Sequence, residues 1–193
     1  MESIKFVLAG TAPFVMHSPI GADPLDPRTI AHKKLTSVRK KTDENHRQIA
    51  RSEYGLAFYD FDPKVGPVIP GRNIHKAIME GGTASKNGKL LKEAMMVMEK
   101  DVQMQYKGPK DIDGLWAMPN DHVHKCPMRM KTGSTVIRYR PMFPGWKVEF
   151  ELAFDDTRIS REDVIAAVHF AGRFKGLGTS RPEFGRFTVK ELK

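Results

Sequence analysis

Residues 68–82 read VIPGRNIHKAIMEGG, and the expected fold is built outward from this stretch. Its apolar start is interrupted by the pair Pro70-Gly71, a combination that commonly precedes a helix. Ile74, Ala77 and Ile78 then recur at the spacing that places them on one face of a helix. The two glycines that close the stretch end that helix. The sequence therefore predicts a helix whose apolar face packs on a core.

Further elements are expected on both sides of this helix. Alternating apolar residues are typical of strands with one buried face, and a Ser-Arg-Glu-Asp start resembles the capping box of a helix. Strands are expected over 4–11, 102–106, 148–152 and 187–189, and a second helix over 161–171. The order strand, helix, strand, strand, helix, strand predicts an α+β fold of the ferredoxin-like type (βαββαβ), with two helices on one face of an antiparallel sheet.

The remaining segments read as additions to one domain that spans residues 1–193, because a chain of this length is typical of a single domain. A basic helical insertion is expected over about 19–53, after the first strand, with Asp26 and Asp43 as helix caps. A hairpin-like excursion is expected over about 108–145, between the second and third strands. Two smaller elements are also expected, a short strand over 54–61 and a helix over 89–100.

The composition predicts a basic protein of a reducing compartment. The 193 residues include 32 Lys and Arg against 23 Asp and Glu, which gives a formal charge of +9. The single cysteine excludes an internal disulfide, and no apolar run approaches the length of a membrane span. The sequence start also lacks the pattern of a signal peptide. We therefore expect a cytoplasmic protein without a membrane partner.

The positive charge gathers in three segments, 28–51, 125–147 and 173–190, whereas many acidic residues lie elsewhere. Lys and Arg gathered in this way favour a phosphate-binding groove over an ordinary solvated surface, because they displace counterions from nucleic acid. Aromatic residues stand among these cations, as in proteins that hold single strands by stacking. The expected nucleic-acid-binding residues are Lys33, Lys34, Arg39, Lys40, Lys41, Arg72, Lys125, Arg129, Lys131, Arg138, Tyr139, Arg140, Arg173, Lys175, Gly176, Gly178, Arg181 and Arg186.

Residues 176–186 read GLGTSRPEFGR and form the most informative loop of the chain, here called the glycine loop. It follows a helix and precedes a strand, which is the reverse of the arrangement in dinucleotide-binding loops. Glycines this dense would let backbone amides approach a phosphate closely. A plain flexible connection is the alternative interpretation.

Taken together, 68–78, the glycine loop and 20–24 (IGADP) resemble motifs of the RAMP superfamily, which supplies backbone and processing subunits of CRISPR effector complexes. Arg72 and Asn73 stand where that family usually has two small residues. The resemblance implies a ferredoxin-like palm, a thumb at the position of 125–140, and binding of single-stranded RNA or DNA. It also implies partners, either copies of this chain or other subunits of a ribonucleoprotein complex.

Two alternatives remain open at this stage. Some RAMP subunits cut RNA with one aspartate and a divalent metal, and Asp23 matches that position, so a magnesium-dependent endoribonuclease is the first alternative. His17 is a weaker candidate for an acid or base. The second alternative is a protein-interaction factor that engages a nucleoprotein complex. His122, His124 and Cys126 alternate as zinc ligands can, but the fourth ligand is missing, so no cofactor is expected for the binding protein.

Overall fold

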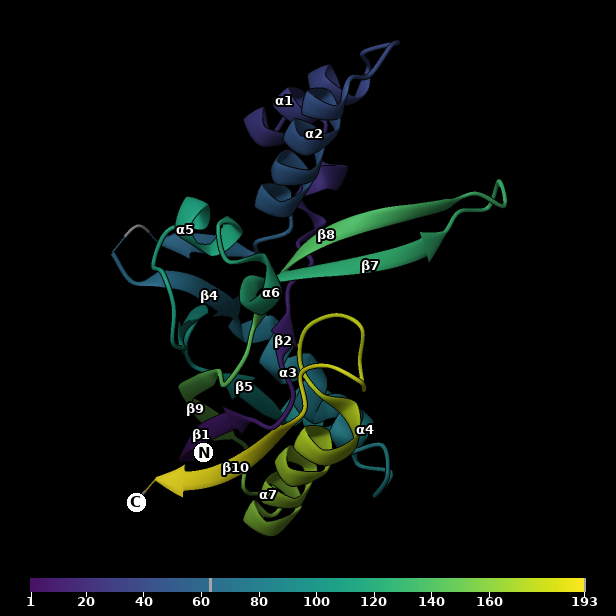
Figure 1. Ribbon diagram of the computed structural model, residues 1–193. Helices are drawn as coiled ribbons and strands as arrows, with labels where there is room; N and C mark the ends of the chain where they lie inside the picture. Colours follow the sequence, from purple (N-terminus) through teal and green to yellow (C-terminus); the bar gives the residue numbers. More distant parts are fainter. Residues whose placement is uncertain (63, 193) are drawn as a thin grey trace.

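Antiparallel strands organise the chain around β1 (Glu2–Gly10), which lies between two other long strands in the sheet. The computed structural model describes residues 1–62 and 64–192 and has a mixed α+β architecture (Figure 1). The main sheet has the strand order β10–β1–β9–β6–β4–β3, and β5 also pairs with β9. The bounds of these partners are β3 (Asp60–Asp62), β4 (Gly66–Pro70), β5 (Met95–Val97), β6 (Asp101–Gln105), β9 (Lys147–Phe154) and β10 (Phe187–Leu192).

One face of this sheet is buried beneath two helices. Ile4, Phe6 and Leu8 alternate along β1 with more exposed residues and belong to the core. The helices α3 (Gly71–Gly81) and α7 (Arg161–Phe170) contribute to the same core, and they pack against each other so closely that a Cβ on Gly81 would lie 2.2 Å from the backbone oxygen of Ala167. The expected helix with Ile74, Ala77 and Ile78 buried is therefore confirmed.

The first basic segment folds into two helices, α1 (Pro27–Thr36) and α2 (Asp43–Leu56), which extend away from the sheet (Figure 1). They follow the short 3-10 turn η1 (Pro19–Ala22). Asp26 caps α1 as expected, but the cap of α2 is Thr42, whose hydroxyl accepts the N–H of Asn45. The expected strand over 54–61 is wrong for most of its length, since a strand, β3, covers only Asp60–Asp62. Tyr54 is fully buried as the last turn of α2, because helical periodicity continues through it.

The second excursion contains a long hairpin, β7 (Val123–Arg129) and β8 (Thr135–Phe143), that projects from the body beside α2 (Figure 1). The short helices α5 (Ile112–Trp116) and α6 (Pro119–His122) precede it. Strand β2 (Phe14–Val15) pairs with the base of β8 and so ties the hairpin to the chain that leaves β1. The expected hairpin-like excursion is present and is narrower than its predicted range.

The segment expected as a helix over 89–100 changes conformation halfway. Helix α4 (Gly88–Ala94) ends early, and the following residues form β5, which pairs with the end of β9. Hydrogen bonding to a neighbouring strand outweighs the helical preference of the Met-rich sequence. After α7 the chain winds through a π turn, η2 (Ala171–Lys175), before entering the glycine loop.

Candidate nucleic-acid interface

A hollow surface lies where the hairpin base, α3 and the glycine loop meet. It consists of two adjoining cavities of about 350 and 360 Å³, and His17 lines both of them. We call it the cationic groove because most of its polar lining residues are basic. Its basic residues are His17, His32, Lys33, Arg72, Lys76, Arg138, Arg140 and Arg181, and its other lining residues include Glu53, Tyr59, Asn73, Tyr139 and Gly178. Figure 1 shows the hairpin on one side of this region and the yellow glycine loop on the other.

Arg140 is the most buried cation of the groove, with only 6% of its surface exposed. Its guanidinium donates to Thr179 Oγ1 at 3.1 Å and lies 3.4 Å from Met128 Sδ, so its recorded partners are a hydroxyl and a thioether. Within residues 1–62 and 64–192, no carboxylate lies at ion-pair distance from it. A guanidinium stays charged in proteins, and a buried charge is costly unless it is paired. Arg140 is therefore a positive charge that an entering anion would neutralise.

The two faces of the hairpin have different roles. Arg140 lies opposite His124 in the strand register, and Arg138 lies opposite Cys126, so these residues share the face toward the glycine loop. Arg138 is already paired with Glu53 of α2 at 2.8 Å.

Three of the expected thumb residues belong to the opposite face. Tyr139 alternates with Arg138 and Arg140, and its ring packs edge-on against Trp116, at 5.9 Å between centroids. Lys125 lies opposite Tyr139 in the register, and Arg129 follows on the same face. The expected binding residues of the hairpin are therefore divided between its two faces, because adjacent strand residues point to opposite sides.

Helix α3 contributes two cations from its first turns. Arg72 and Lys76 are four residues apart, so they share one side of the helix, and both line the groove. Neither side chain forms a hydrogen bond or an ion pair with another residue that the structure describes. The helix also begins without an acidic residue or a side-chain cap, so its partial positive charge is not compensated locally. This end of α3 adds to the positive potential of the groove.

The glycines of the loop serve packing more than amide presentation. Gly178 has φ +84°, and a Cβ there would lie 2.5 Å from the backbone oxygen of Val15. The N–H groups of Gly176, Leu177, Thr179 and Gly185 all bond to backbone oxygens within the protein. These amides are therefore occupied within the fold, whereas the N–H of Gly178 is not among those used, so presentation of loop amides to a phosphate stays a prediction for the remaining positions.

Arg181 is the cation that the glycine loop places in the groove. Its Nη1 donates to Glu80 of α3 at 2.9 Å and to the backbone oxygen of Gly176 at 3.3 Å. These bonds fix the side chain between the loop and the helix. A fixed guanidinium binds phosphate with a smaller loss of conformational entropy than a mobile one.

The neighbouring histidines and a tyrosine report the positive potential of the groove. Burial lowers the pKa of His17 and of His124, and the Arg140 charge lowers both further, whereas Glu53 and Glu183, respectively, oppose the shift. Burial also lowers the pKa of His32, whose Nδ1 lies 3.1 Å from Ser52 Oγ.

Tyr59 lies at the other end of the groove. Burial raises the pKa of its hydroxyl, and the charges of Arg181, Arg140 and Arg72 oppose that rise. Arg72 and Arg181, from α3 and the glycine loop, line the same cavity as Tyr59, and Arg140, from β8, lines the adjoining one. Elements that are far apart in the sequence thus build one site.

Several expected binding residues lie outside the groove. Lys34, Arg39, Lys40 and Lys41 are exposed around the connection between α1 and α2, which we call the helical tip, and Lys131 is exposed at the turn of the hairpin. Arg173 and Arg186 line a separate cavity of about 770 Å³ beside β10, where Arg173 lies over the ring of Phe174. Lys175 is half-buried in η2 and lines neither cavity of the groove.

The residues of the alternative interpretations have ordinary structural roles. Asp23 follows η1, and its carboxylate accepts the N–H of Leu25 at 2.9 Å, as aspartate does in turns. His122 is buried and bonds through Nδ1 to the backbone oxygen of Met142 at 3.0 Å, away from His124, whose ring packs on Phe184. Over the described part of the chain, no group of three or more His, Cys, Asp or Glu side chains is placed to hold a metal ion.

Sequence reasoning missed Lys76, Tyr59 and His32, which line the groove, and also His124, which lies opposite Arg140 in the hairpin. Lys76 could have been found, because it stands four residues after Arg72 on a predicted helix. Tyr59, His32 and His124 come from three separate segments, and no local pattern connects them. Their proximity depends on how the hairpin and α1 dock on the sheet.

Comparison with known proteins adds no relative to this description. No protein-family model matches the chain, and no curated protein matches it in sequence. Among the helices of residues 1–62 and 64–192, none has both the length and the apolar character required to cross a bilayer.

Proposed function

We propose that this protein binds single-stranded nucleic acid, preferably RNA, through phosphate contacts in the cationic groove. Arg140 carries the proposal, because it is a buried guanidinium with no carboxylate at ion-pair distance in the described chain. Arg72, Lys76 and Arg181 line the adjoining cavity of the groove, and His17 is common to both cavities. Successive phosphate diesters of a strand would neutralise this group of charges and release their own counterions.

We further propose that the core is ferredoxin-like and the chain a divergent RAMP-like subunit that assembles along its strand. The support for the fold is the order β10–β1–β9–β5/β6, together with α3 and α7 packed in one core. The support for the subunit is that the hairpin and the glycine loop, expected from the resemblance, flank the groove. Cooperative binding to longer strands is the behaviour that this assembly requires.

The test is a titration of labelled single-stranded RNA and its DNA equivalent across a salt series. The double variant R72Q/K76Q should weaken binding by about ten- to hundredfold and lower the salt slope by about 1.4, since each phosphate contact to a single strand contributes roughly 0.7. The matched control is K147Q/K190Q. It removes the same charge from exposed residues of β9 and β10 on the open face of the sheet and should change affinity by less than about twofold.

The same samples distinguish the alternatives. RNA that is cut with magnesium but protected by EDTA and by Asp23→Ala would replace the binding function with a nuclease. Equal losses in both double variants would mean that net charge, and not the groove, attracts the strand. Absence of binding at low salt would reject the nucleic-acid function and leave the protein-interaction factor, which a stable protein partner in a pull-down would identify.

A further inference from the structure

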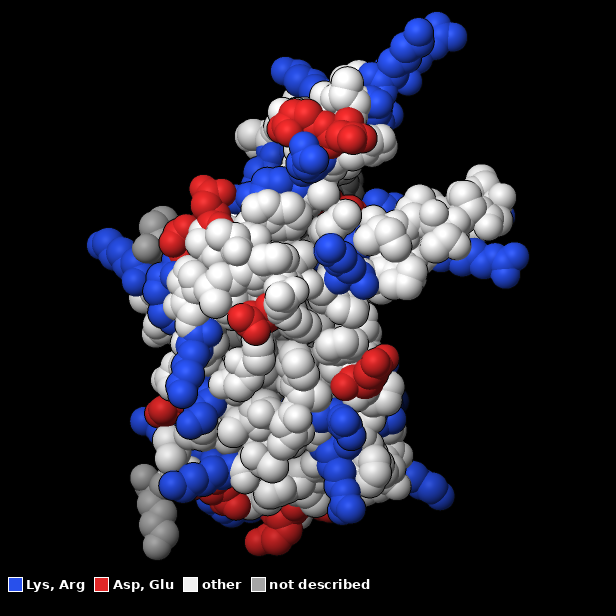
Figure 2. All heavy atoms as spheres, viewed as in Figure 1, with Lys and Arg blue, Asp and Glu red and all other residues white. Residues whose placement is uncertain are grey.

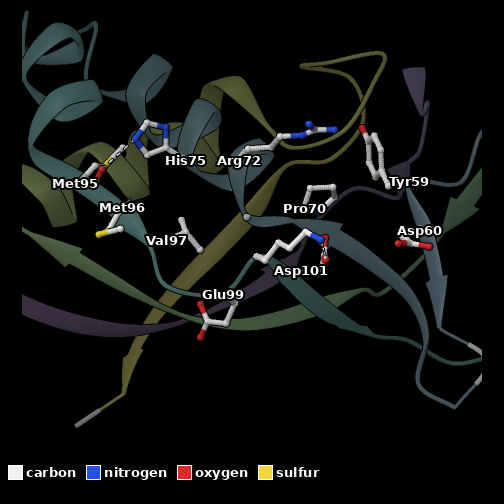
Figure 3. A pocket seen from close by; sticks show the side chains of 12 residues that line it. Tyr59, Asp60, Pro70, Arg72, His75, Met95, Met96, Val97, Glu99 and Asp101 are labelled. Carbon is white, nitrogen blue, oxygen red and sulfur yellow. Dashed lines mark hydrogen bonds and ion pairs between the residues drawn. The ribbon is translucent and has the colours of Figure 1, made fainter. Parts of the chain in front are cut away.

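A third cavity, of about 530 Å³, adjoins the cationic groove and has a different chemical character. Arg72 and Tyr59 line both this cavity, which we call the side pocket, and the groove itself. Figure 3 shows the Arg72 side chain extending toward Tyr59, with Met96, Val97 and Glu99 on the other side of the pocket. The two hollows are therefore continuous at this residue pair.

The side pocket is unsuited to a phosphate. Three carboxylates line it, Asp60, Glu99 and Asp101, against the cations Arg72 and Lys100. The carboxylate of Glu99 accepts the N–H of Glu151 through both oxygens, at 3.0 and 3.1 Å. Asp101 is less engaged, since its recorded ion pair is a 4.0 Å contact with Lys100. The sign of the charge thus changes from positive to negative across Arg72.

The pocket also offers apolar surface beside these acceptors. Met96 is 51% exposed, although it belongs to strand β5, and Pro70 and Val97 lie in the same lining. A methionine side chain packs favourably against flat aromatic rings. His75 donates from Nε2 to the backbone oxygen of Met95 at 3.2 Å, so its proton is on Nε2 and its Nδ1 is a hydrogen-bond acceptor. Most of the polar atoms of the lining therefore accept hydrogen bonds.

We propose that the side pocket takes the nucleobase of a nucleotide whose phosphate lies in the cationic groove, and that it favours bases with an exocyclic amino group over uracil. The inference rests on the proposed function, since the phosphate contacts in the cationic groove position the nucleotide so that its base can enter the side pocket. The amino group of cytosine, adenine or guanine donates to a carboxylate, whereas the O4 atom of uracil would face it as a second acceptor. Asp101 is the acceptor with the fewest competing bonds.

The test compares fluorescent oligocytidine and oligouridine of roughly ten nucleotides, which are similar in size and differ in the amino group. The protein should bind oligocytidine about tenfold more tightly. Met96→Trp fills the pocket with an indole ring. Asp101→Asn replaces a carboxylate, which only accepts hydrogen bonds, by an amide, which can also donate one to the O4 atom of uracil. In each variant the affinities for the two oligomers should lie within about twofold of each other. In Met96→Trp this should result mainly from weaker binding of oligocytidine.

Matched variants keep the result interpretable. Met98→Trp adds the same ring at a neighbouring position that is 56% exposed and outside the pocket, and it should keep the preference. Glu149→Gln removes an exposed carboxylate from the open sheet face and should also keep it. Equal binding of both oligomers to the unaltered protein, or an equal effect of Met98→Trp, overturns the side-pocket proposal alone. Failure to bind either oligomer overturns the proposed function as well.

Discussion

The cationic groove and the helical tip are both basic, but their cations lie in opposite surroundings. In the groove, Arg140 is buried and Arg181 is fixed by Glu80. At the helical tip, Lys34, Arg39 and Lys40 are exposed, and Figure 2 shows Lys and Arg side chains extending from this end of the molecule into solvent. The cations of the groove are therefore placed for close contact with a bound anion, whereas those of the helical tip attract an anion from a distance.

Cations in the groove and at the helical tip should contribute differently to binding, because they differ in hydration, in salt screening and in the conformational entropy that they lose. An exposed lysine is hydrated and screened by salt, so each such charge changes affinity little and mainly speeds the encounter. A guanidinium that is already desolvated and held in place loses little entropy and little hydration when an anion arrives. Two cations that add the same formal charge thus contribute differently to the affinity for RNA. Three predictions test this contrast.

The largest effect is expected from Arg140→Met. Affinity for single-stranded RNA should fall by about ten- to hundredfold, because a charge-assisted contact of about 1.5–3 kcal/mol is lost. Thermal stability should stay the same or rise, since replacing a buried charge by an apolar side chain of similar size is often stabilising. Titration and thermal denaturation of the same preparation measure both. A variant that melts earlier and binds normally would show that Arg140 is only a structural residue.

A smaller effect is expected from pH. The pKa values of His17, His32 and His124 are lowered in the folded protein, so the free protein should lose stability as the pH falls through about 6.5, where the unfolded chain takes up protons more readily. Bound phosphates favour the protonated rings, so RNA affinity should instead increase by about three- to tenfold between pH 7.5 and 5.5. The measurement is a series of titrations at constant ionic strength.

The histidine origin of that pH dependence can be checked directly. His17→Gln combined with His124→Gln should flatten the profile, because Gln does not titrate in this range. The remaining charged groups that act on the three rings are Glu53, Glu183, Arg138 and Arg140. Affinity that decreases toward acid pH in the unaltered protein would contradict the prediction.

The smallest effect is expected at the helical tip. Removing two exposed charges in K40Q/K41Q should weaken equilibrium binding by less than about twofold near physiological salt and should lower the association rate at low salt. Stopped-flow association at two salt concentrations measures both. A loss as large as that of R72Q/K76Q would contradict the contrast between the two regions.

Elements with strong local signals could be predicted from the sequence. The helix at 71–81 and the cap at Ser160 were predicted because apolar spacing and capping chemistry act over a few residues. The strand at Met95–Val97 was not predicted, because its partner is β9, more than fifty residues later. For the last turn of α2 the sequence predicts a strand, because Tyr54 and the aromatic residues after it suit both conformations.

The binding site, like the fold, has features that the sequence determined and features that only the tertiary structure decided. The sequence by itself determined that the chain is basic, that its charge gathers in three segments and that a glycine loop precedes the last strand. Only the tertiary structure decided that Arg72, Arg140 and Arg181 line two adjoining cavities, while Arg173 and Arg186 line another cavity. The physical reason is that charge and local propensity belong to individual residues, whereas burial, and with it the strength of a charge, depends on which distant segments pack around it.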